Sequence, residues 1–167
     1  MGHYIHAIIA SPDVLAMLPH AGVHAIAIPL SQGLAMVPLI EHLLENLPES
    51  DMVCPSGSDR FEHLCSAVCA QLSQLSRHGP VAYCETDYHG GSGGQCAVVW
   101  DNEEMVMPPT HLIAPPRSRE TEANGPINAA LRILGVEAKG GEDEFDTVGL
   151  SWFRDDLDWI ESLQDDE

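Results

Sequence analysis

Two carboxylates and an imidazole alternate along one stretch of this chain, at Glu85, Asp87 and His89. Residues two apart in a β-strand point to the same face, so the three side chains are predicted to lie side by side. Such a set can bind a divalent metal, or can pair a general base with the group that orients it. The opposite face of the same strand carries residues typical of a core side, namely Ala82, Cys84, Thr86 and Tyr88. A solvated polar face therefore explains the three residues without chemistry, and the metal site is kept as the alternative.

The other residues capable of chemistry form no recognisable catalytic or cofactor motif. Nine histidines are present, but no His-Glu-x-x-His pattern occurs, and His3 and His6 fall in a predicted strand, where residues three apart face opposite ways. The glycine-rich run at 90–94 precedes strand residues rather than a helix and has no adjacent lysine, which argues against phosphate binding. We therefore expect no enzyme activity, no metal and no other cofactor.

The five cysteines indicate a reducing environment. Their number is odd, and no two are separated by two residues as in a zinc knuckle. No cysteine lies among basic residues that would lower its pKa. The N-terminus lacks the basic start and apolar run of a secretory signal, and the apolar stretches are far shorter than the roughly 20 residues that span a bilayer. These features predict a cytoplasmic protein with no membrane association.

Charge is the strongest functional signal. The chain carries 26 acidic and 7 basic side chains, a formal net charge of −19, and 44% of its 167 residues are apolar. The apolar content predicts a folded protein, and the charge predicts repulsion of nucleic acid and attraction of a basic protein. The negative charge is densest in 137–167, which holds twelve acids and two bases, a net of −10.

Aromatic residues lie among the acids of this C-terminal segment. An aromatic anchor with a charged rim is the usual composition of a protein–protein contact. We predict that the partner-binding surface is made from the following side chains: Asp143, Glu144, Asp146, Trp152, Asp155, Asp156, Asp158 and Trp159. Either tryptophan could serve as the anchor.

The elements that position these residues predict a single α+β domain over 1–167, with a mainly antiparallel sheet and helices packed on one face. Period-two alternation over 81–107 predicts a meander of three strands, and 108–125 is predicted to be an irregular connection. The acidic segment 137–167 is predicted to be helical in part. Further strands are predicted at 4–10, 23–30 and 34–37, and helices at 38–47, 58–75, 126–134, 144–148 and 154–163.

A small, acidic, cytosolic α+β protein without catalytic residues resembles the immunity proteins of bacterial toxin systems. The stretch from Ala82 to Trp100, with its Glu-Thr-Asp-Tyr-His-Gly-Gly sequence, is similar to short proteins predicted from bacterial toxin loci. The resemblance implies an inhibitor that binds and neutralises a cognate basic toxin domain. The alternatives are a small metal-dependent enzyme that uses Glu85, Asp87 and His89, and a non-catalytic adaptor, for which a homodimer is possible.

Overall fold

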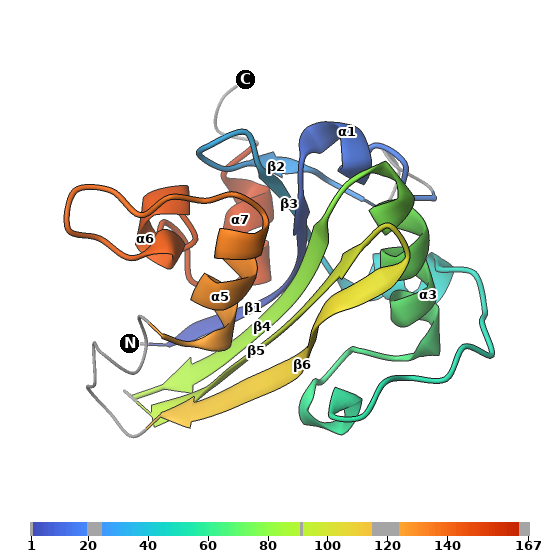
Figure 1. Cartoon of the computed structure of the whole chain (residues 1–167). Helices are drawn as coiled ribbons and strands as arrows, with labels where there is room; N and C mark the ends of the chain where they lie inside the picture. The colour runs from blue at the N-terminus through green and yellow to red at the C-terminus, as the bar shows by residue number, and fades with distance from the viewer. Residues whose placement is uncertain (1, 20–24, 91, 115–123, 164–167) are drawn as a thin grey trace.

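Six strands form one antiparallel sheet in the order β2-β3-β1-β4-β5-β6 (Figure 1). The computed structural model describes residues 2–19, 25–90, 92–114 and 124–163. The antiparallel α+β class is thus confirmed, as are the β2–β3 hairpin and the meander that ends the sheet. The strands are β1 (His3–Ala10), β2 (Ile28–Pro29), β3 (Ala35–Pro38), β4 (Val81–His89), β5 (Ser92–Asp101) and β6 (Glu104–Ala114).

Helices cover both faces of the sheet rather than the one face we expected (Figure 1). The central strands are apolar on both of their alternating sets, so each face needs cover from water. On β1, Ile8 packs into one core and Ile9 into the other. One face carries α1 (Pro12–Leu15), α2 (Glu41–Asn46) and α3 (Ser66–Leu75); the opposite face carries α5 (Pro126–Ile133), α6 (Glu144–Val148) and α7 (Asp156–Glu161).

The helix predicted over 58–75 is wrong in its first half. A single 3-10 turn covers Ser58–Arg60, the chain then leaves helical geometry, and α3 begins only at Ser66. Phe61 and Leu64 are buried as the apolar periodicity required, but from a loop. The reason is a non-local partner for the loop backbone, which is described with the site.

The connection predicted as irregular over 108–125 is also partly wrong, because β6 continues to Ala114. Pro108 and Pro109 are tolerated within β6 because it is an edge strand, where one side of the backbone needs no ladder hydrogen bond. Of the strand predicted at 23–30, the structure shows β2 at Ile28–Pro29, and 20–24 lie outside the described residues. None of the helices in the described ranges has the length and apolarity needed to cross a bilayer.

Candidate functional site

The N-terminal half of β1 has an open edge that the C-terminal segment fills. β3 is short and pairs only with Ala7–Ala10, and the Leu39 amide that follows it donates to the His6 carbonyl at 2.7 Å, so the edge of β1 before His6 is left for another segment. The Tyr4 amide donates to the Arg154 carbonyl at 2.6 Å, and the His6 amide donates to Asp156 Oδ1 at 3.1 Å. These two bonds bring Asp156, which is far from His6 in the sequence, next to the His6 ring.

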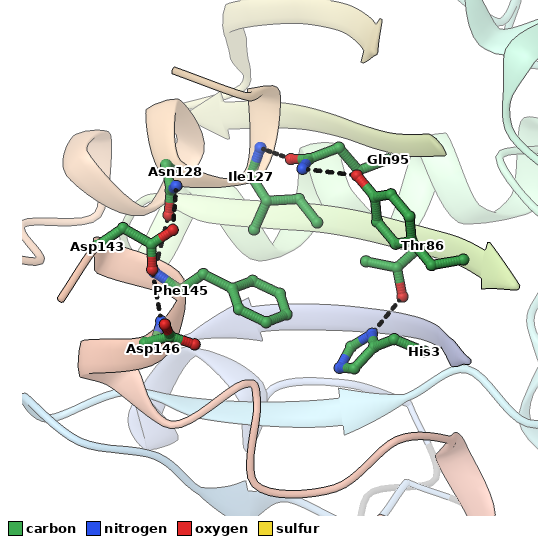
Figure 2. Close-up of a pocket in the computed structure, with 9 residues that line it drawn as sticks. His3, Thr86, Gln95, Ile127, Asn128, Asp143, Phe145 and Asp146 are labelled. Atoms are coloured by element: carbon green, nitrogen blue, oxygen red, sulfur yellow. Dashed lines mark hydrogen bonds between the residues drawn. The ribbon is translucent and has the colours of Figure 1, made fainter. Parts of the chain in front are cut away.

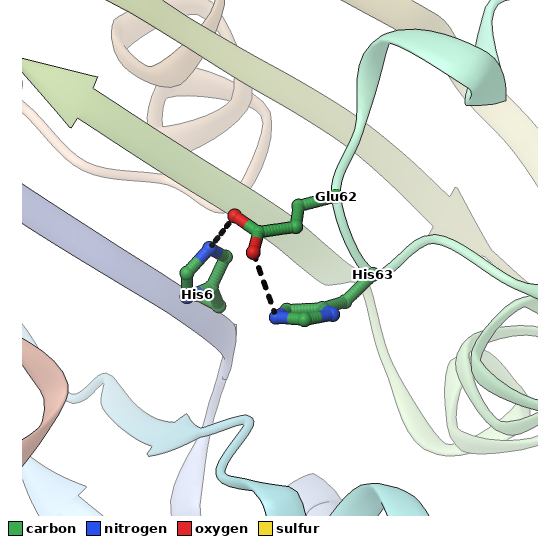
Figure 3. A group of neighbouring side chains, drawn as sticks. All are labelled: His6, Glu62 and His63. Atoms are coloured by element: carbon green, nitrogen blue, oxygen red, sulfur yellow. Dashed lines mark hydrogen bonds and ion pairs between the residues drawn. The ribbon is translucent and has the colours of Figure 1, made fainter.

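The His6 ring lies between two carboxylates, of which Figure 3 shows that of Glu62. His6 is 3% exposed; its Nδ1 is 3.1 Å from Asp156 Oδ2, and its Nε2 is 3.1 Å from Glu62 Oε2. Ionised carboxylates only accept hydrogen bonds, so both contacts are satisfied together when the ring carries both protons. Burial acts to lower the pKa of His6, but the hydrogen bond and charge of Asp156, with Glu85 and Glu62, outweigh it and raise the pKa.

Glu85 holds the loop that carries Glu62. Its Cα is paired with that of His6 across the β1–β4 ladder, and the side chain is only 6% exposed. Glu85 Oε2 accepts from the Glu62 amide at 2.7 Å, and Oε1 accepts from the His63 amide at 2.8 Å and from the Tyr83 hydroxyl at 2.6 Å. These three donors replace water around a buried charge and keep the loop out of helical geometry.

The Glu62 carboxylate lies between two imidazoles and a phenol. Tyr4 donates its hydroxyl to Glu62 Oε2 at 2.6 Å, and His63 Nε2 is 3.8 Å from Glu62 Oε1. The hydrogen bond between Tyr4 and Glu62 raises the pKa of Tyr4 to about 12 and lowers the pKa of Glu62. Candidate ligand atoms of His6, Glu62 and His63 all lie within 4.8 Å of one another. A hollow of about 460 Å³ adjoins His6 and Glu62, and another of about 380 Å³ adjoins His6 and His63.

A third hollow, of about 210 Å³, lies on the opposite face of the sheet beside His3 (Figure 2). His3 Nε2 is 3.0 Å from the Leu150 carbonyl, and Nδ1 is 2.7 Å from the Thr86 hydroxyl. Because a carbonyl only accepts, Nε2 carries the proton. Thr86 accepts from the Ile5 amide at 3.1 Å and donates to Nδ1, so this network fits a neutral ring. Burial lowers the pKa of His3.

The remaining polar groups of this third hollow hold elements together. Gln95 accepts from the Ile127 amide at the start of α5 and donates to the Tyr88 hydroxyl (Figure 2). Asn128 donates to Asp143 and accepts from the Phe145 amide, which ties α5 to α6. Their hydrogen bonds are used within the fold, so this hollow offers few groups for chemistry.

The structure separates the three residues that alternate on β4. Glu85 is buried beneath the loop, whereas Asp87 and His89 are exposed and form an ion pair at 2.7 Å. Within the described part of the chain, the residues grouped closely enough to hold a metal are instead His6, Glu62 and His63. The loop ligands were missed because their segment was predicted to be helical. The inward-facing His6 in an apolar strand was the available signal.

Four acids of the predicted partner surface have structural roles. Asp143 and Asp155 accept from backbone amides at the starts of α6 and α7 and cap these helices. Glu144 is buried and pairs with Arg132 at 2.6 Å, and Asp156 binds His6.

The other members of the predicted surface divide by exposure. Trp159 is 1% exposed and packs into the core, with the Phe153 ring edge-on at 4.8 Å between centroids. Trp152 is 58% exposed, and Asp146 and Asp158 are exposed. Leu157, which was not predicted, is 67% exposed on the same segment.

Buried thiols show no sign of activation. Burial raises the pKa of Cys69 and of Cys96 to about 12 and raises that of Cys84 further. A thiol attacks as the thiolate, so these three groups are poor nucleophiles near neutral pH.

Comparisons of the chain with protein families, with curated proteins and with solved structures find no match. The site is therefore interpreted from its own geometry.

Proposed function

We propose that this protein binds and neutralises a cationic protein, as an immunity protein does to its toxin, through its acidic C-terminal segment. We define this segment as the contact segment, residues 142–161. The observation that carries the proposal is the exposure of Trp152 and Leu157, at 58% and 67%, in a segment whose exposed polar side chains include Asp146 and Asp158. Large exposed apolar side chains with an acidic surround suit a basic partner surface.

The contact segment is held rigid by its own buried residues. Trp159 anchors α7 in the core, and the capping aspartates Asp143 and Asp155 fix the starts of α6 and α7. Trp152 lies against Gly149, where a Cβ would be 2.7 Å from the indole ring. A preorganised surface loses less side-chain and loop freedom on binding, which favours affinity.

The net charge of −19 adds steering over a longer range. Opposed fields raise association rates above the roughly 10⁵–10⁶ M⁻¹s⁻¹ of unsteered pairs, and salt reduces the gain. An inhibitor that must reach its target before damage occurs benefits from a fast association rate. Both the acids that stabilise the fold and the acids at the contact contribute to this field.

The test uses two triple variants with the same net charge. The contact variant carries Glu142→Lys, Asp146→Lys and Asp158→Lys, and the matched control carries Glu45→Lys, Glu49→Lys and Asp51→Lys, all exposed positions. The full chain is first used to isolate a basic partner from the source organism, and affinities are then measured at several salt concentrations. We expect the contact variant to bind at least about 100-fold more weakly with a flatter salt dependence, and the control to lose less than about 10-fold.

Equal losses in the two triple variants would show that only the overall field matters and would overturn the assigned surface. The proposed function itself would be overturned if the wild-type chain retained no basic protein, or if it bound a basic protein without inhibiting that protein's activity.

The anchor is tested separately with a substitution that leaves charge unchanged. Trp152→Ala is expected to weaken partner binding about 30-fold, as truncation of a central aromatic residue typically does. Val53→Ala, at an apolar side chain that is 86% exposed elsewhere, is the matched control and is expected to bind as wild type. Unchanged affinity in Trp152→Ala would contradict the anchor.

A further inference from the structure

We propose that His6, Glu62 and His63 form a binding site for one divalent transition metal ion, best suited to zinc, with a fourth coordination position open to solvent. Two imidazoles and a carboxylate are the donor types that zinc prefers, and three protein ligands with one open position are typical of its non-structural sites. The three donor residues lie outside the contact segment, which contributes the supporting residue Asp156 and, with Leu157, part of the lining of the hollow of about 380 Å³.

The spacing of the donor atoms fits a tetrahedral ion. Bonds of about 2.0–2.2 Å place the ligand atoms about 3.3–3.6 Å apart in a tetrahedron. His6 Nε2 and Glu62 Oε2 are already 3.1 Å apart, and His63 Nε2 is 3.8 Å from Glu62 Oε1 (Figure 3). His63 is partly exposed on its loop, and the candidate ligand atoms of the three residues all lie within 4.8 Å of one another.

Hydrogen bonds behind the three donors orient them. Asp156 Oδ2 is 3.1 Å from His6 Nδ1 and accepts the proton that Nδ1 keeps. An ion would replace the proton on Nε2, whose lone pair then points toward Glu62. A carboxylate behind a ligating histidine is the usual outer partner in zinc sites. Tyr4 holds Glu62 at 2.6 Å, and Glu85 holds the backbone of both loop ligands.

Charge and access also favour a cation. Three carboxylates surround the position, from Glu62, Asp156 and Glu85, and a bound divalent ion would offset two of these charges. The hollow of about 380 Å³ reaches both His6 and His63, which gives an ion a route from solvent and leaves room for a water ligand.

The test is a metal titration of the full chain after treatment with a chelator. We expect one Co²⁺ per chain, with the visible absorption of a four-coordinate ion and without thiolate-to-cobalt charge transfer, and its displacement by one equivalent of Zn²⁺. His63→Ala and Glu62→Gln are expected to weaken zinc binding at least about 100-fold, and Asp156→Asn about 10–100-fold. His89→Ala removes an exposed, ion-paired histidine outside the cluster and is expected to bind as wild type.

Circular dichroism of each metal-free variant checks that it is folded. If His63→Ala does not fold, Glu62→Gln provides the test of the ligand set. Absence of stoichiometric binding, thiolate absorption that places the ion on the cysteines, or wild-type affinity in both ligand variants would overturn the site. Partner binding is measured in the presence of chelator, so failure of the metal site leaves the proposed function to be judged separately.

Discussion

His3 and His6 lie three residues apart on one strand, yet their surroundings differ in kind. His3 faces the core of α5, α6 and α7 and contacts a hydroxyl and a carbonyl, whereas His6 faces the other side and contacts two carboxylates. Burial acts on both rings in the same direction. The net pKa shift is nevertheless downward for His3 and upward for His6.

The difference shows that burial sets the direction of the pKa shift unless charged partners outweigh it: burial lowers the pKa of His3, and the carboxylates around His6 overcome the same effect. The neutral network around His3 stabilises the sheet and its covering helices. The carboxylates around His6 raise its pKa and lie with it at the wall of a hollow. One strand thus presents a histidine with neutral partners on one face and a histidine with carboxylate partners on the other.

The largest effect is expected from breaking the loop clamp on the His6 side. Glu85→Ala removes the acceptor of two backbone amides and of the Tyr83 hydroxyl, and we expect it to lower the free energy of unfolding by about 3 kcal/mol. Denaturant titration measures this loss. Asp87→Ala, on the same strand but exposed, is the control and is expected to change stability by less than about 0.5 kcal/mol. Similar stability in the two variants would mean that Glu85 does not hold the loop.

A smaller effect is expected from exchanging each histidine for an apolar residue. His6→Leu leaves the largely buried Asp156 carboxylate without its ring partner, and we expect a loss of about 2 kcal/mol. His3→Leu leaves neutral groups that need less compensation, and we expect a loss of about 1 kcal/mol. Both are measured by denaturant unfolding with a chelator present. A reversed order of the two losses would contradict the distinction between charged and neutral surroundings.

Much of the sheet follows from local sequence, as the meander from β4 to β6 illustrates. Its period-two alternation and the Asp101-Asn102-Glu103 turn are contained within the segment itself, and Asn102 and Glu103 take the positive φ angles that such a turn requires. The helix predicted over 126–134 is likewise local, with Pro126 in its first turn and Gly135 after its end.

The site depends on contacts that local sequence does not contain. Phe61 and Leu64 have helical spacing, but the Glu62 and His63 amides bond to Glu85, more than twenty residues away. Asp156 reaches His6 across 150 residues because β3 is too short to cover the whole edge of β1. Sequence alternation correctly placed His3 and His6 on opposite faces, but it could not reveal which partners each would meet.

The smallest effect is expected from pH, and it concerns His3. The folded pKa of His3 lies below its ordinary value of 6.5, so the unfolded chain binds more protons than the folded chain as the pH falls below that value. His3 therefore costs stability as the pH is lowered through 6.5 toward the folded pKa, and the cost stops growing below the folded pKa.

The stability advantage of wild type over His3→Leu is the measurement that isolates this effect, and it should shrink across that interval. Asp143 and Asp146 of α6 line the same hollow, and Asp156 and Arg154 act on His3 by charge. All four are present in both proteins, so their own titration largely cancels in the difference. An advantage that grew toward low pH would mean that His3 gains a stabilising partner when charged, as His6 does, and the contrast between the two faces of β1 would fail.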